Sequence, residues 1–290
     1  MVQRLFLLGI VAFSQILSAE VLFEGFAKVV AGGVHVGYFI SRYEFNTAKK
    51  EFIATSFLKT NELGGNITES IKAYAKEDLT PISYSYTTLI GNTPKTIDAK
   101  FNSGKMNASI KDGDKVSKVN RDLPKGAFLS SFLAYVMLKS PKGLTPDTKY
   151  EYQAIAEEDA QLQKGIAYIK NLEEINGIKA YKILNEFKGQ KFISSVTERG
   201  EVLSTKSPVQ SISTELMSQS SLATVGFQLP TSLLKQLFGD IPIGTKNEVS
   251  KKYQAVGKQQ GVPQGKGLML KGGGEEKAEP KNSTEDEQKN

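Results

Sequence analysis

The chain contains no cysteine and no tryptophan, a single histidine at position 35, and four arginines among its 290 residues. Without cysteine there is no disulfide, no thiol nucleophile and no thiolate ligand for a metal ion. One histidine cannot supply the paired imidazoles that are typical of zinc sites, so we expect neither a metal nor a cofactor. Hydrophobic residues make up 39% of the chain. A protein of this length can therefore bury a core that is stable without cross-links.

The charge balance is only moderately basic. Lysine and arginine number 37 against 31 aspartates and glutamates, which gives a net charge of +6. Lysines and glutamates alternate along the sequence, and no arginine-rich block occurs. Proteins that bind nucleic acids concentrate their basic residues on one face or one helix. We therefore predict no nucleic-acid partner.

The amino-terminal segment MVQRLFLLGIVAFSQILSA predicts the compartment. Arg4 precedes an apolar run, and small residues follow the run up to Ala19. This order is typical of a secretory signal peptide, with cleavage after Ala19. The apolar run is shorter than the roughly 20 residues that a membrane-spanning helix needs, although an uncleaved anchor remains the alternative. We expect a periplasmic protein, or alternatively a secreted one, with no transmembrane segment after cleavage.

Most of the remaining sequence has the pattern of β-strands. Between residues 21 and 119, alternating segments rich in β-branched and aromatic residues are separated by Gly, Asn, Asp or Pro. Such spacing predicts an antiparallel meander. Strands return after residues 143–156 and continue over 165–207, where Asn176-Gly177 is a strong hairpin signal. We predict a signal peptide over 1–19 and one β-domain over 20–207.

One apolar segment interrupts the strands. The spacing of Phe128, Phe132, Val136 and their neighbours predicts a helix over residues 126–139. We therefore predict a mainly β (α+β) fold, in which a curved antiparallel sheet or half-barrel wraps around this helix. Residues 208–253 are predicted as a partly helical extension. Residues 254–290, rich in Gly, Lys, Glu and Gln, are predicted as a disordered tail.

Four stretches together resemble a known type of domain: GGVHVGYFISRYEF, LPKGAFLSSFLAYVML, GLTPDTKYEYQ and ERGEVLS. They resemble the uncharacterised periplasmic β-domains that stand alone after a signal peptide or accompany transglutaminase-like proteins. Those domains are similar in fold to the outer-membrane lipoprotein carriers of the Lol system. The resemblance covers residues 21 to about 207 and implies a sheet wrapped around a helix, in the periplasm. It supplies no catalytic residue, because the nucleophile of the transglutaminase-like relatives is a cysteine in a separate domain.

The chain offers few groups for catalysis. A hydrolase would have to use His35, which lies near the start of a predicted strand, and no G-x-S-x-G elbow accompanies it. We interpret His35 as part of the sheet and keep a hydrolase as the least favoured function. The acidic groups at 157–159 and 173–174 lie in or beside predicted turns. We expect these carboxylates to face solvent.

The aromatic residues suggest binding instead. A space between helix and sheet could admit an apolar ligand. The first hypothesis is therefore a non-enzymatic carrier whose partner is a lipid or a lipidated protein. The second is a structural or interaction module of the cell envelope with a fully packed core and a protein partner. The residues predicted to line the space are Phe128, Phe132, Val136, Tyr84 and Tyr86.

Overall fold

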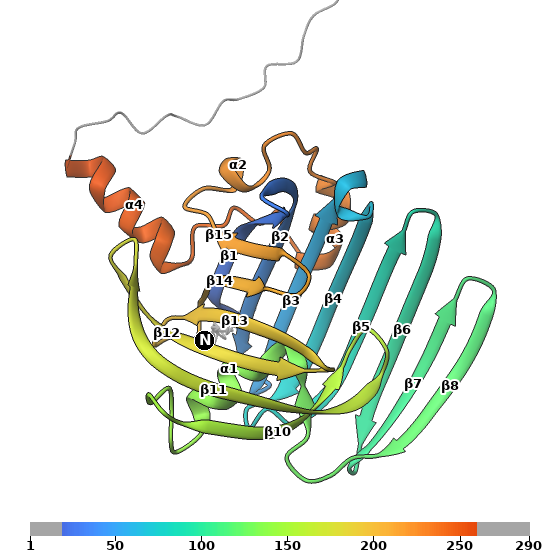
Figure 1. The fold of residues 1–290 in the computed structure, drawn as a ribbon. Coiled ribbons are helices and arrows are strands. Elements are labelled where there is room, and N and C mark those ends of the chain that lie inside the picture. Colours follow the sequence, from blue (N-terminus) through green and yellow to red (C-terminus); the bar gives the residue numbers. More distant parts are fainter. Residues whose placement is uncertain (1–18, 260–290) are drawn as a thin grey trace, which may run out of the picture.

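The computed structural model describes residues 19–259, and one large curved sheet dominates it (Figure 1). The sheet has 15 strands, which confirms the predicted mainly β fold. The predicted signal peptide, except for its last residue, and the predicted tail from residue 260 onward lie outside the described residues. The strands of the first half are β1 (Glu20–Ala31), β2 (Val34–Asn46), β3 (Glu51–Thr60), β4 (Ile67–Lys76), β5 (Pro81–Ile90), β6 (Thr93–Asn102), β7 (Lys105–Asp112) and β8 (Lys115–Asp122).

The second half of the sheet is built from shorter and more varied strands, and short helices accompany the sheet. Its strands are β9 (Phe128–Leu129), β10 (Lys149–Ala156), β11 (Gln161–Ile175), β12 (Ile178–Phe187), β13 (Gln190–Val196), β14 (Val202–Ser207) and β15 (Ile212–Leu216). The helices are η1 (Glu62–Gly64), η2 (Ser130–Phe132), α1 (Leu133–Lys139), α2 (Ser220–Ala223), α3 (Thr231–Phe238) and α4 (Glu248–Gln259), where η denotes a 3-10 helix.

The sheet consists of two meanders, β1–β8 and β9–β15, and they are joined where β1 pairs with β15. The order runs from β8 back to β1, then to β15, and from there back to β9. Neighbouring strands pair antiparallel, except that the two-residue strand β9 pairs in parallel with β10. Strand β1 lies between β2 and β15, with Ala27 opposite Leu216. Pairing between strands from the two ends of the described region therefore holds the two meanders together.

Turn chemistry explains why many strands end where the sequence predicted. Asn176 and Gly177 both have positive φ values, 51° and 74°. Two such residues form the tight turn whose twist matches the flanking antiparallel strands. Strands β3 and β4 occupy residues 51–60 and 67–76, as the alternation predicted. Local sequence is sufficient to set these boundaries.

The predicted helix over 126–139 is wrong at its beginning. Residues 128–129 form β9, residues 130–132 form η2, and α1 covers only 133–139. Glu157 accepts hydrogen bonds from the side chains of Ser130 and Ser131, at 2.5 and 2.6 Å, and from the backbone N–H of Ser131 at 3.1 Å. These bonds to a residue beyond β10 hold the chain away from a regular helix before Leu133.

The segment from η2 to α1 lies between the two halves of the sheet. Phe132 packs in a core cluster with Tyr84 and Met106 of the first half. Met137 packs in a second cluster with Ile169 and Ile183 of the second half. The sheet therefore wraps around this apolar segment as predicted, even though the helix itself is short.

Residues beyond 207 continue the fold, so the predicted end of the β-domain at residue 207 is wrong. Strand β15 pairs with both β1 and β14. Helices α2 and α3 then cover the outer face of β1–β3, where Leu234 and Phe238 pack against Phe26, Ile40 and Phe57. The first three strands are thus apolar on both faces, which requires a covering layer on each side.

Helix α4 extends beyond the predicted limit of the ordered chain. It runs through residues 254–259, which the sequence assigned to the tail. Its start is fixed by Asn247, whose side-chain oxygen accepts a hydrogen bond from the backbone N–H of Ser250 at 2.8 Å. An asparagine in this position satisfies one of the free N–H groups of the first helical turn.

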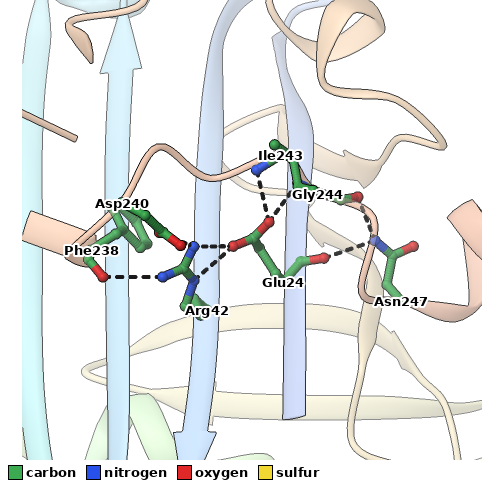
Figure 2. A network of polar contacts seen from close by, with 7 residues as sticks. All are labelled: Glu24, Arg42, Phe238, Asp240, Ile243, Gly244 and Asn247. Carbon is green, nitrogen blue, oxygen red and sulfur yellow. Dashed lines mark hydrogen bonds and ion pairs between the residues drawn. The ribbon is translucent and has the colours of Figure 1, made fainter. Parts of the chain in front are cut away.

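A buried ion pair ties the carboxy-terminal layer to the sheet (Figure 2). Arg42 on β2 lies opposite Glu24 on β1, and its Nε donates to Glu24 at 2.7 Å. The same guanidinium donates to the carbonyl of Phe238 at 3.1 Å and to Asp240 at 2.6 Å. The other carboxylate oxygen of Glu24 accepts from the backbone N–H groups of Ile243 and Gly244, at 2.9 and 2.6 Å. We call the pair formed by Glu24 and Arg42, with these partners, the latch.

Candidate functional site

A groove of about 690 Å³ borders α1 on the side of β10 and β11. Three α1 residues, and Ser140 directly after the helix, face it with the spacing of one helical face. Facing them are two tyrosines of β10, the backbone around a glycine of β11, and the loop that leads into β9. These features comprise Leu133, Val136, Met137, Ser140, Tyr150, Tyr152, Gly165, Gly126 and Phe128, and the space is also lined by Lys125, Glu151, Gln153, Lys164 and Ile166. We call this space the α1 groove.

A glycine is needed for the floor of the α1 groove. Tyr152 on β10 lies opposite Gly165 on β11. A Cβ atom added at Gly165 would lie 2.2 Å from the Tyr152 ring, which is far inside van der Waals contact. The tyrosine ring can therefore lie across β11 only because position 165 has no side chain. The ring also packs near Phe128 and Phe187, with centroid distances of 5.5 and 5.9 Å.

The hydroxyls of the two groove tyrosines are already hydrogen-bonded. Tyr152 donates to the side-chain oxygen of Asn185 at 2.7 Å, and Tyr150 donates to the carbonyl of Gly143 at 2.5 Å. Burial raises the pKa of Tyr152 to about 12, so its hydroxyl stays protonated near neutral pH. The rings therefore contribute apolar area to the groove, while their polar ends are satisfied elsewhere.

A smaller hollow of about 310 Å³ continues the groove past the other side of α1. It shares Gly126, Phe128, Val136 and Ser140 with the α1 groove, and it reaches the β4–β5 turn at residues 78–80. Lys139 lines this end. The two spaces are thus continuous along α1, and Asp78 and Lys139 both line the smaller one.

The structure separates the residues that the sequence predicted to line a ligand space. Phe128 and Val136 line the α1 groove. Phe132, Tyr84 and Tyr86 instead pack in the core cluster between α1 and the first half of the sheet. Their side of the helix is filled, because Ile97, Met106 and Ala108 on the neighbouring strands also point into it; the space lies on the β10–β11 side.

Tyr84 and Tyr86, which the sequence predicted to line the ligand space, differ in their polar contacts. The Tyr86 hydroxyl donates to Glu69 at 2.9 Å, whereas the buried Tyr84 hydroxyl has no hydrogen-bond partner among the described residues. Burial, together with nearby carboxylates, raises the pKa of both hydroxyls. Both tyrosines therefore stay neutral and serve as packing groups.

The expectation that the acidic group 157–159 faces solvent is wrong for Glu157. This side chain is 1% exposed, and burial raises the pKa of its carboxyl. Its bonds to Ser130 and Ser131 position the start of η2, next to the α1 groove. Glu158 and Asp159 follow the expectation more closely, since both are only partly buried and accept hydrogen bonds from Lys188 at 2.6 and 2.5 Å. No spacing within the sequence distinguishes Glu157 from its acidic neighbours.

His35 lies on β2, as the sequence analysis interpreted it. Its Nε2 is 2.9 Å from the carbonyl oxygen of Gly37 and 3.1 Å from that of Ala223 in α2. Its ring also packs against Phe227, at 5.3 Å between centroids. A catalytic histidine needs a nucleophile and a carboxylate at its two nitrogens. The hydrogen bonds of His35 within the described residues go to main-chain carbonyls, which anchors the outer layer to the sheet.

Residues 19–259 contain neither a metal-binding cluster nor a helix that could span a membrane. No group of three or more His, Cys, Asp or Glu side chains there has the geometry to hold a metal ion. No helix in the same region is both long enough and apolar enough to cross a membrane.

A scan against protein-family models and a search of curated proteins both found no match. Among solved structures, the chain is similar to the beta-barrel-like protein of domain of unknown function DUF1849 from Brucella abortus. The sequences are 9% identical, the TM-score is 0.49, and the likeness covers 69% of this chain and 98% of that chain. This likeness assigns no ligand and no activity to the α1 groove.

Proposed function

We propose that the protein is an exported, non-enzymatic binding or carrier protein, and that the α1 groove holds an apolar ligand or the acyl chain of a lipidated partner. The observation that supports this is the groove itself, with its volume of about 690 Å³. Pockets for small organic ligands typically measure roughly 300–1,000 Å³ and are mostly apolar. Export is proposed from the signal-peptide pattern of residues 1–19, and recovery from the periplasm with an amino-terminus at Glu20 would support it.

The side chains that α1 contributes to the wall are apolar, which favours an alkyl chain on that side of the groove. Leu133, Val136 and Met137 present aliphatic groups and a thioether, and Phe128 and Tyr152 present ring faces. Methionine adapts its shape to irregular apolar partners. The tyrosine hydroxyls bond within the protein. The polar side chains that remain on the wall are Lys125, Glu151, Gln153 and Lys164, which could hold the polar end of such a ligand.

A second candidate is a structural or interaction module of the cell envelope. The opposite side of α1 favours it, because Phe132, Tyr84 and Met106 are almost completely buried in a filled core. In such a module the α1 groove would be a surface depression without a ligand of its own. Direct binding measurements separate the two candidates.

The experiment titrates the purified protein with cis-parinaric acid, a fatty acid whose fluorescence rises in an apolar site. Val136→Trp fills the groove, and Ser140→Trp obstructs it from the end of the helix. The matched control is Val116→Trp on the edge strand β8, at a valine that is 65% exposed. We expect the two groove variants to weaken binding by at least roughly tenfold, which corresponds to about 1.4 kcal/mol, and the control to bind like the parent. Absence of binding by the parent, or equal weakening by the control, refutes the carrier.

A further inference from the structure

An apolar rim occupies the end of the sheet opposite to the α1 groove. It is formed where β14–β15, β1–β2, β3–β4 and β5–β6 turn, and three of these turns lie along the upper edge in Figure 1. The groove reaches the β4–β5 turn, at the other end of β4. A strand of ten residues spans roughly 33 Å, so the two features lie far apart. The apolar rim consists of Val34, Leu63, Leu89, Ile90, Val209 and Ile212.

Hydrogen bonds show that these turns are neighbours in space. The N–H of Gly32 donates to the carbonyl of Ser211 at 3.0 Å, which joins the β1–β2 and β14–β15 turns. The N–H of Asn61 donates to Val36 at 2.8 Å, next to the β3–β4 loop. The β5–β6 turn follows through a bond of 3.3 Å from Gly91 to Asn66. The rim is therefore one continuous surface.

The rim side chains project into solvent. Their exposed fractions run from 39% at Leu89 to 78% at Val209. Leu222 and Val225, which are 43% and 63% exposed, extend the surface beside α2, the helix that His35 joins to β2. Scattered exposed aliphatic residues are normal, whereas a gathered set of them marks an interaction surface.

Charge is almost absent from the rim. The turn segments 32–34, 61–66, 89–92, 208–212 and 219–227 contain one charged residue, Glu62. The chain as a whole is 23% charged. A surface with this pattern offers no electrostatic recognition of a charged protein partner, but it matches the uncharged acyl region just below lipid headgroups.

We propose that the apolar rim docks the protein on a lipid bilayer by inserting the tips of its turns. The rim residues lie on separate turns, so a protein partner would need a complementary pocket for each of them. A fluid bilayer can adapt its shape to all of them. Insertion also requires that backbone polar groups be paired, and the bonds between turns pair several of them. Because charge contributes little, binding is expected to depend weakly on salt.

The test measures co-sedimentation of the full chain with neutral phosphatidylcholine vesicles, at low and high salt. We expect binding at both salt concentrations. Leu63→Asp and Val209→Asp place a charge at the two most exposed rim positions, and each should lower the partition coefficient by roughly tenfold. The control Leu172→Asp lies on β11, at a leucine that is 48% exposed, and should bind like the parent.

Several outcomes overturn the proposal. The first is no binding of the parent to neutral vesicles, and the second is binding only to anionic vesicles that high salt abolishes. A third is equal weakening by the Leu172→Asp control. A fourth is self-association in light scattering that the rim variants abolish without any vesicle binding, which would identify a second copy of the chain as the partner. Thermal unfolding of each variant confirms that the exposed substitutions leave the fold intact.

Discussion

The latch allows a quantitative prediction for Arg42→Met. Arg42 and Glu24 are each 4% exposed, and the arginine donates to Glu24, to the carbonyl of Phe238 and to Asp240 (Figure 2). Methionine keeps the unbranched apolar stem of the side chain but not the guanidinium, whose Cζ lies 5.3 Å from the centroid of the Phe238 ring. What it removes is the charge, so Glu24 remains as a buried carboxylate without its counter-ion.

The expected loss follows from the contacts that remain. Removing one partner of a buried ion pair costs about 3–5 kcal/mol. Glu24 keeps its hydrogen bonds from Ile243 and Gly244, which stabilise its charge in part. We therefore expect a loss near the lower end, about 3 kcal/mol in the free energy of unfolding. Since domains are stable by roughly 5–15 kcal/mol, this is a large fraction of the total.

Two further variants make the prediction specific. Asp240→Asn removes the other anion that faces Arg42, but the Asp240 side chain is 69% exposed, so we expect a loss below about 1 kcal/mol. In Glu24→Gln/Arg42→Met the buried charge is gone, while the amide oxygen still accepts from the same backbone N–H groups. The double variant should therefore be more stable than Arg42→Met alone.

The assay is reversible urea unfolding followed by circular dichroism, with the free energies combined in a double-mutant cycle. The reasoning is refuted if Arg42→Met costs no more than Asp240→Asn. It is equally refuted if the losses of the single variants Glu24→Gln and Arg42→Met simply add in the double variant, because the pair would then have no interaction energy.

Three further predictions concern other buried groups. Burial raises the pKa of Glu157, so the folded state keeps a proton that the unfolded chain releases near pH 4.3. The parent should therefore lose stability relative to Glu157→Gln as the pH rises from about 4 through the raised pKa. A difference in urea unfolding that does not change with pH contradicts this. Asn247→Ala removes the cap of α4 and two bonds to carbonyls, of Glu24 and Gly244, and should cost about 1–3 kcal/mol, with an unchanged unfolding midpoint as the contrary result. Leu129→Ala, at a fully buried side chain, should cost about 2–5 kcal/mol in the same assay, and a loss under about 1 kcal/mol would show that the site is loosely packed.

The sheet was predictable because its information is local. Gly, Asn and Pro mark most turns, and each strand of the first half carries its own alternation of residue types. The start of the helix could not be predicted from the neighbouring residues, because it depends on Glu157, which comes 26 residues after Ser131 in sequence. The floor of the α1 groove is also non-local, because Gly165 and Tyr152 meet only when β10 and β11 pair.

The covering layer beyond residue 207 did leave a trace in the sequence. Strands β1 to β3 carry large apolar side chains at both odd and even positions, for example Phe23 with Phe26 and Phe52 with Phe57. A strand with one solvent-exposed face alternates apolar and polar residues, whereas a strand covered on both faces does not. This pattern could have predicted a second layer, although it does not say which segment supplies it.

The strand order has a consequence for how the molecule is assembled. A chain cut between β8 and β9, with its described ends linked, would visit every strand in spatial order, since β1 and β15 are neighbours and β8 and β9 lie at opposite edges. In the natural chain, β1 acquires its second neighbour only after Leu216 exists, almost 190 residues downstream of Ala27. Hairpins form within microseconds, but a contact this distant in sequence forms slowly. Until then, the nascent polypeptide has an unpaired backbone edge along β1, where another strand or a chaperone could bind first.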